Sequence, residues 1–227
     1  MRTTATLAPS LALGAFTLTY GPAAVLQYRG IGSPPPAQTT ASTEWPDAGS
    51  GLSVPATVDI FNQSNVTLNA AKTTGQLKLS GTAGVSAKLF LGANNITADS
   101  VVIPNIDGNK YVVTDAAGAL TLRNVSNADT AFFHVGPTSS LYHPAGIIND
   151  GTTDDYSVRA ISAPGTCTPA LTSVNASWEI AEATALGSNL RLVFDYSTAT
   201  TGSSYTVSNA TMVHCTGITP DYWNGSV

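Results

Sequence analysis

The sequence carries little charge: 10% of its 227 residues are charged, and Lys and Arg together number only 9. The formal net charge is -5. A nucleic-acid surface needs clustered Lys and Arg to neutralise phosphates, and no such cluster exists here. We therefore expect no nucleic-acid partner. Few stretches could form a solvent-facing helix with ion pairs, so an all-β chain is the default expectation.

Long hydrophobic runs are also missing. No stretch reaches the roughly 20 apolar residues of a membrane span, so no membrane partner is expected. The short apolar run 11–16 behind Arg2 weakly resembles a signal peptide, but Thr17 and Thr19 interrupt the apolar pattern. We expect this segment to remain in the mature chain.

Recognisable catalytic patterns are absent from the sequence. His134, His143 and His214 are widely spaced, and none has a Cys or His at metal-ligand spacing. The acidic segment 149–155 lacks the ligand order of a calcium loop, and there is no nucleophile elbow or phosphate-binding glycine loop. Scattered carboxylates that pair in a groove remain an alternative. We expect no enzyme, no catalytic residue, no metal and no cofactor.

Cysteine is scarce, with only Cys167 and Cys215 present. A disulfide between them would close a loop of about fifty residues and stabilise the fold by a few kcal/mol in an oxidising compartment. The alternative is two free thiols that behave as small buried apolar groups.

What the sequence does contain is a degenerate unit that occurs at residues 75–113 and again at 118–158, offset by about 43 positions. Each copy has alternating leucines after a glycine, then two further apolar segments, an Asp-Gly pair and a segment with a tyrosine. The matching segments are 74–79 with 117–122, 88–92 with 132–136, 101–104 with 146–148, 107–108 with 150–151, and 110–113 with 155–158. The alternative is a chance echo in a Gly-punctuated β protein.

The residue pattern predicts strands throughout this region. Leu77 and Leu79, like Leu120 and Leu122, alternate with polar neighbours, as a strand with one buried face requires. The fold class we expect is all-β: antiparallel β-sandwich or barrel-like modules with an extended N-terminal arm and at most one short helix. That helix is placed at 177–183, because Glu and Ala favour a helix there.

Composition divides the chain into four parts. We expect an N-terminal arm at 1–32, a Pro/Gly/Ser-rich linker at 33–55, a β body with the two-copy repeat at 56–158, and a C-terminal β region at 159–227. Within the last part, strands are expected at 190–196 and 205–207.

The arm and linker hold the apolar and aromatic residues that we consider as an interface with a neighbouring subunit, since rigid aromatics supply buried area at low entropic cost. The alternative is that the aromatic ones close the chain's own core. The candidates are Leu11, Leu13, Phe16, Tyr20, Tyr28 and Trp45.

Two segments of the central third resemble small β modules of tailed-bacteriophage virion proteins. The first is 88–98 followed by 101–104, and the second is 120–128 followed by 132–136. Those families often carry a leucine-threonine-x-x-asparagine-x-serine strand and then an aromatic strand that ends in glycine. The resemblance implies a non-enzymatic virion component that works through its surfaces.

Among virion roles the sequence favours a capsid decoration (cement) protein on the outer surface of the virion. Its arm would staple neighbouring subunits of the major capsid protein, or other virion proteins, and its body would form a homo-oligomer, most simply a trimer. One alternative is a short head or tail fibre or receptor-binding protein whose loops 138–143 and 198–204 contact host glycans. A second alternative is a secreted adhesin or pilin-like subunit, which would need the cysteine bridge and a processed N-terminus.

Overall fold

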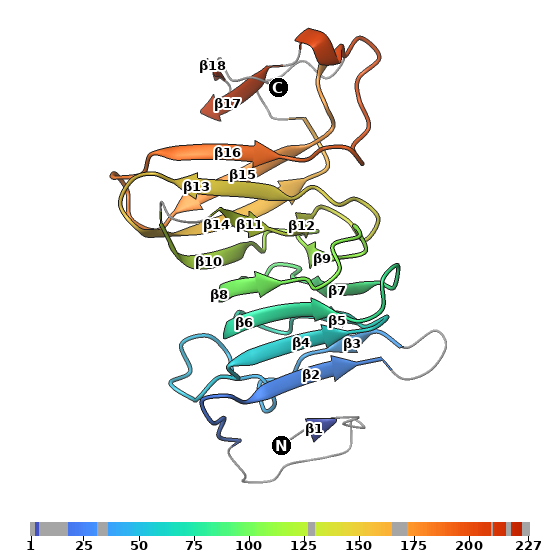
Figure 1. Cartoon of the computed structure of the whole chain (residues 1–227), viewed down its shortest axis with the longest axis vertical. Helices are drawn as coiled ribbons and strands as arrows, with labels where there is room; N and C mark the ends of the chain where they lie inside the picture. The colour runs from blue at the N-terminus through green and yellow to red at the C-terminus, as the bar shows by residue number, and fades with distance from the viewer. Residues whose placement is uncertain are drawn as a thin grey trace.

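The computed structural model describes residues 3–4, 18–30, 36–126, 130–164, 172–209, 211–216 and 219–223. Strands are the main regular structure of these residues, which confirms the all-β expectation. Apart from Thr172, their helical residues are those of the three-residue η2 (Val207–Asn209). None of the described helical segments is long and apolar enough to cross a membrane. Figure 1 shows the strands stacked across the long axis, with the described ends of the chain at opposite ends of the stack.

Two sheets make up most of the molecule. The strands of the first sheet, in spatial order, are β1 (Thr3–Thr4), β2 (Val25–Arg29), β4 (Thr57–Phe61), β6 (Lys72–Ser80), β8 (Ile96–Val102), β10 (Leu120–Val125), β14 (Asp154–Ile161) and β15 (Ser177–Glu182). The strands of the second sheet are β12 (Val135–Gly136), β9 (Lys110–Val113), β7 (Ala87–Phe90), β5 (Asn65–Thr67) and β3 (Gln38–Thr39).

From β2 to β10 the chain alternates between these sheets, and every pairing is parallel. In the first sheet Lys72 pairs with Ile96 and Ile96 with Leu120, a step of 24 residues each time. In the second sheet Leu89 pairs with Val112, a step of 23 residues. The region is therefore a solenoid in which each turn contributes one strand to each sheet.

The core lies between the two sheets and is continuous along the solenoid. Parallel registration places equivalent inward side chains above one another, so Leu26, Val58 and Leu77 form one row of the first sheet. Val66, Leu89, Val112 and Val135 form the opposing row of the second sheet, and all four are fully buried. No single turn could bury its apolar face alone, so stacking of neighbouring turns creates the core.

Successive turns of the solenoid are also in close backbone contact with one another. Gly118 donates its N–H to the carbonyl of Gly92 on the turn below at 2.9 Å. A Cβ atom at Gly118 would lie 2.2 Å from the Asn94 carbonyl oxygen, so only glycine allows this approach.

The parallel stack ends at β10 in the first sheet and at β12, which pairs in parallel with β9, in the second. Strand β10 pairs in parallel with β8 but antiparallel with β14, and its register shifts between Leu122 and Val125 where Asn124 has a positive φ of 58°. Antiparallel pairing then continues from β14 to β15. A third sheet, β11 (Ala131–Phe133), β13 (Ala145–Asn149) and β16 (Leu190–Phe194), is antiparallel throughout, as is the pair β17 (Met212–Thr216) and β18 (Thr219–Trp223).

The expectation of antiparallel modules is therefore wrong for residues 25–125 and for β12, and right for the other C-terminal strands. The two-copy unit is not the structural repeat: its first copy spans two solenoid turns, whereas its second passes into antiparallel strands. All eight strand segments that defined the copies do overlap strands. Segment 177–182 is the strand β15 and not a helix, because its alternating Trp178 and Ile180 pack on the core. Segment 205–207 is not a strand, whereas β16 confirms the strand expected at 190–196.

The expected arm and linker are in large part elements of the solenoid. Val25–Arg29 is the strand β2 of the first sheet, and Gln38–Thr39 is β3 of the second. Trp45, in the expected linker, is fully buried and donates its Nε1–H to the Thr73 carbonyl at 2.9 Å. A boundary at residue 32 would cut through the first turn of the solenoid.

Candidate binding surface

An aromatic row lies where the solenoid meets the C-terminal sheets. It consists of Phe132, His134, Tyr142 and Tyr111, with ring centroids 6.3, 6.2 and 5.4 Å apart in that order. The His134 and Tyr142 rings are stacked, and the His134 Nδ1 and the Tyr142 hydroxyl share a hydrogen bond of 2.6 Å. The two ends of the row differ in exposure: Phe132 is 52% exposed, whereas Tyr111 is 1% exposed.

Two loops that are far apart in sequence meet beside this row. The Tyr142 N–H donates to Thr198 Oγ1 at 3.2 Å, and the Thr198 hydroxyl donates back to the Tyr142 carbonyl at 3.0 Å. The Tyr111 hydroxyl donates to the Thr138 carbonyl at 2.9 Å. These bonds fasten loop 138–143 to loop 198–204 and to the solenoid; we call the two loops the loop pair. Both are rich in Ser and Thr, residue types that adapt their hydrogen bonds in binding loops.

The row is uncharged at neutral pH. Burial lowers the pKa of His134 to about 4, so its imidazole is neutral. Burial raises the pKa of Tyr111 to about 12. Burial, and then the Asp195 carboxylate, raise the pKa of Tyr142 to about 12. The row therefore offers aromatic faces and neutral hydrogen-bonding groups, which suits an uncharged polar ligand.

A second aromatic group supports the loop pair from behind. The Trp178 Nε1–H donates to the His143 carbonyl at 2.9 Å, and the Trp178 ring stacks on Phe194 with centroids 4.4 Å apart. His143 is fully buried, and its ring nitrogens have no hydrogen-bond partner within the described residues. Burial lowers its pKa, while the Asp195 carboxylate opposes that shift. A neutral His143 thus acts here as an apolar packing group.

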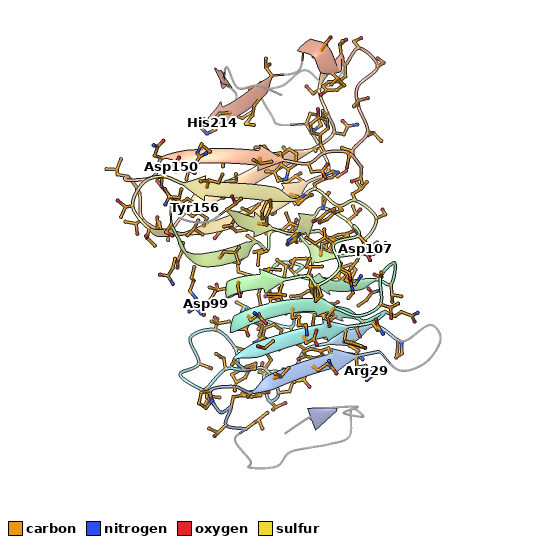
Figure 2. The ribbon with its side chains drawn as sticks, viewed as in Figure 1. Arg29, Asp99, Asp107, Asp150, Tyr156 and His214 are labelled. Carbon is orange, nitrogen blue, oxygen red and sulfur yellow. The ribbon has the colours of Figure 1, made fainter. Side chains whose placement is uncertain are left out.

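Below the row, Lys110 pairs with a carboxylate and Lys88 lies over the Tyr111 ring. Lys110 Nζ lies 2.7 Å from Asp107 Oδ2, and Lys88 Nζ lies 5.0 Å from the centroid of the Tyr111 ring. Burial tends to raise the pKa of Asp107, but hydrogen bonds from Lys110 and from the Gly84 and Asn109 N–H groups lower it to about 2. Figure 2 shows Asp107 on the same side of the molecule as Arg29, farther along the stack. The ionised Asp107 ties the turn before β9 to the neighbouring turn, which fixes the base of the row.

The three expected interface residues that the structure describes, Tyr20, Tyr28 and Trp45, lie outside the aromatic row and the loop pair. Tyr28 and Trp45 are 6% and 0% exposed and belong to the chain's own core, so the core alternative holds for both. Tyr28 donates its hydroxyl to Glu44 Oε1 at 2.8 Å, and the half-buried Tyr20 donates to the Glu44 carbonyl. Burial raises the pKa of both tyrosines, and the Glu44 charge raises each further. Neither Tyr28 nor Trp45 is available to a neighbouring subunit.

Three of the expected interface residues, Leu11, Leu13 and Phe16, lie outside the described residues, and so does Cys167. Cys215 lies in β17 and is disulfide-bonded. The pairing of Cys215 with Cys167 stays a prediction.

The structure brings His134 and His143 to one region through Tyr142 but leaves His214 on β17. Across the described ranges no three His, Cys, Asp or Glu side chains cluster as metal ligands would. The sequence predicted loops 138–143 and 198–204 as glycan contacts under one alternative role, but the aromatic row was not predicted. The signal available was the density of aromatic residues between 132 and 142, in a chain with only 7% aromatics.

Comparisons with protein-family models, with curated proteins and with solved structures find no match to this chain.

Proposed function

We propose that this chain is a non-enzymatic structural protein that binds a partner through the loop pair and the aromatic row. The solenoid serves as the rigid support. Of the roles expected from the sequence, the one best supported is a short fibre or receptor-binding protein that contacts host glycans. The observation that carries it is the reciprocal hydrogen bonding of Tyr142 and Thr198, which joins two polar loops beside an exposed aromatic ring.

The chemistry of the surface favours a neutral glycan. Phe132 is half-exposed and its ring face can stack on the apolar face of a sugar. Ser and Thr hydroxyls of the loop pair supply donors and acceptors for sugar hydroxyls. The resemblance to phage modules supports a place on the outer surface of a virion, where such loops would meet a host cell.

Binding to a panel of immobilised glycans tests this proposal. The full chain is compared with Phe132→Ser and Thr198→Val, and Leu186→Ser serves as the matched control because Leu186 is 90% exposed on a different loop. We expect one glycan class to bind, both site variants to weaken it at least tenfold, and the control to bind as the parent does. Absence of any bound glycan, or full binding by Phe132→Ser with an unchanged melting temperature, would contradict the proposal.

Capsid decoration is the second candidate, supported by the pairing of β1 with β2. Residues Thr3–Thr4 add to the first sheet in parallel beside Leu26, so this end of the sheet accepts an added strand. The corresponding segment of a neighbouring copy could add there in the same way and link subunits. Deletion of residues 1–17 keeps β2 and tests the idea: loss of attachment to capsids with an unchanged melting temperature supports it, and full attachment excludes it.

A further inference from the structure

A polar pocket of about 310 Å³ opens at the end of the solenoid opposite the C-terminal sheets. It is lined by Arg29, Gly30, Asn62, Gln63, Thr82 and Val85. Arg29 is the last residue of β2, and the other lining residues follow the ends of β2, β4 and β6. These strands are neighbours in the first sheet, with Arg29, Phe61 and Ser80 in register. We call it the β2–β6 pocket. Figure 2 shows Arg29 at the end of β2.

Unequal turn lengths create this pocket. β4 ends at Phe61 and β5 begins at Asn65, whereas the connections on either side, from β2 to β3 and from β6 to β7, are longer. The short turn is possible because Asn62 and Gln63 adopt positive φ values of 35° and 54°. The tight turn 62–64 next to the longer turn 81–86 leaves a recess at its level.

Internal hydrogen bonds hold the walls in place. Buried Ser64 donates its hydroxyl to the Phe61 carbonyl at 2.7 Å and accepts the Gly30 N–H at 2.6 Å. Asn62 Oδ1 accepts the Thr82 N–H at 2.7 Å, which leaves the Asn62 amide with its NH₂ donors. These bonds fix Gly30, the turn 62–64 and Thr82 to one another, so this part of the recess is held in place in advance of any ligand.

The lining combines one cation with neutral polar groups and has no carboxylate. Arg29 takes part in none of the ion pairs found among the described residues, and its guanidinium lies 4.9 Å from the centroid of the Phe61 ring. Cation–π contact orients this group without neutralising it. In a chain of net charge -5, the pocket is a local positive site.

We propose that the β2–β6 pocket binds the carboxylate of an acidic sugar, such as a uronic acid. Arg29 would pair with the carboxylate through two parallel N–H donors, an arrangement for which guanidinium is shaped. Asn62, Gln63 and Thr82 offer the amide and hydroxyl groups that sugar hydroxyls require. The volume lies at the lower end of ligand sites, which suits a single saccharide unit. An acidic peptide would use the cation but would leave this neutral polar lining unmatched.

Titration calorimetry of the full chain with D-glucuronate, D-glucose, acetate and an oligoglutamate peptide tests the proposal. We expect glucuronate to bind at least tenfold more tightly than each of the other three. Arg29→Gln should reduce glucuronate affinity at least tenfold, and Thr82→Val should reduce it severalfold. Lys78→Gln is the matched control, because Lys78 lies on β6 outside the pocket, 4.0 Å from Asp59.

Equal binding of acetate would reduce the site to a simple anion site, and preferential binding of oligoglutamate would replace the sugar by an acidic peptide; either result overturns the proposal. So does unchanged glucuronate affinity in Arg29→Gln. Melting temperatures establish that each variant is folded, and Thr82→Val provides an independent test if Arg29→Gln is not. Phe132→Ser should leave glucuronate binding unchanged, so this proposal and the proposed function of the loop pair fail separately.

Discussion

The solenoid strands β4 and β9 and the C-terminal strands β15 and β16 bury their residues to very different degrees, although β13 and β14 hold buried residues such as Ile147 and Tyr156. In β4 and β9 nearly every residue is buried or half-buried, and Val58, Ile60 and Val112 are fully inaccessible. In β15 and β16 no residue is fully buried. β4 and β9 each have a neighbouring strand on both sides, whereas β15 and β16 are edge strands. Stability should therefore concentrate in residues 25–125, while the C-terminal region has more accessible surface for binding.

The sharpest test of this contrast is the same truncation in both regions. Leu77→Ala removes a fully buried side chain from the middle of β6 and should lower the free energy of unfolding by about 3–5 kcal/mol. Leu192→Ala removes a half-buried side chain of β16 and should cost about 1 kcal/mol. Urea unfolding followed by circular dichroism measures both. Equal losses of unfolding free energy in the two variants would show that the two regions are equally well packed.

Ion pairs should also contribute more to stability in the solenoid than in the C-terminal region. Lys72 is fully buried, and its Nζ donates to Asp47 Oδ1 and to the Trp45 carbonyl, both at 2.6 Å. Lys72→Ala loses these bonds and the packing of the side-chain stem, so we expect a loss of about 2–3 kcal/mol. Arg191→Ala breaks the exposed pair with Asp150 in the C-terminal region and should leave the urea midpoint unchanged. A comparable loss in the two variants would contradict the contrast.

Mild acid should weaken the C-terminal region alone, because the solenoid residues 25–125 contain no histidine. The pKa of His134 is lowered by burial to about 4, from an ordinary value of 6.5, so the unfolded chain takes up the proton first. The stability that neutral His134 contributes is present above pH 6.5 and is lost as the pH falls towards 4. Between pH 7 and 5 the loss should be about 1–2 kcal/mol.

Two tryptophans, the buried Trp45 and the half-buried Trp178, report the regions separately. In a Trp223→Phe background, Trp178→Phe leaves Trp45 as the probe of the solenoid, and Trp45→Phe leaves Trp178 as the probe of the C-terminal region. Only the Trp178 signal should shift to lower urea as the pH falls, and His134→Asn should remove part of this shift. A pH effect of the same size at Trp45, or none at either probe, would show that His134 does not destabilise this region in acid.

The strands were predictable from the sequence, but their direction was not. Leu77 and Leu79 alternate with polar neighbours because one face of β6 is buried, and that pattern is the same in a parallel solenoid and in an antiparallel sandwich. The signal that distinguishes the parallel solenoid from a sandwich is a spacing of 23 residues. Val66, Leu89 and Val112 each begin a four-residue segment that is followed by alanine. The three segments end at Asn69, Gly92 and Asp115. The offset of about 43 residues does not show this spacing, because the second copy of the unit begins at β10, where the pairing changes from parallel to antiparallel.

The candidate sites were less predictable than the strands. Loop pairing depends on Tyr142 and Thr198, which are 56 positions apart and meet only because β13 pairs with β16. The β2–β6 pocket depends on relative turn lengths, which become visible only once the strand register is known. Burial of Tyr28 and Trp45 in the core also depends on tertiary packing, because the Pro-rich composition around Trp45 is equally typical of a linker.

The smallest expected difference in stability is between two threonine variants at the junction of the two regions. Thr73, Thr97 and Thr121 form a row on β6, β8 and β10, which Ser157 continues on β14. Thr121 and Ser157 share a side-chain hydrogen bond of 2.7 Å across the first antiparallel pairing, whereas no described hydrogen bond involves the Thr97 hydroxyl. Thr121→Val should therefore cost about 1 kcal/mol and Thr97→Val less than about 0.5 kcal/mol. Urea unfolding midpoints measure both losses of stability. A greater loss in Thr97→Val than in Thr121→Val would mean that the row is stabilised within the parallel stack and not by the Thr121–Ser157 hydrogen bond.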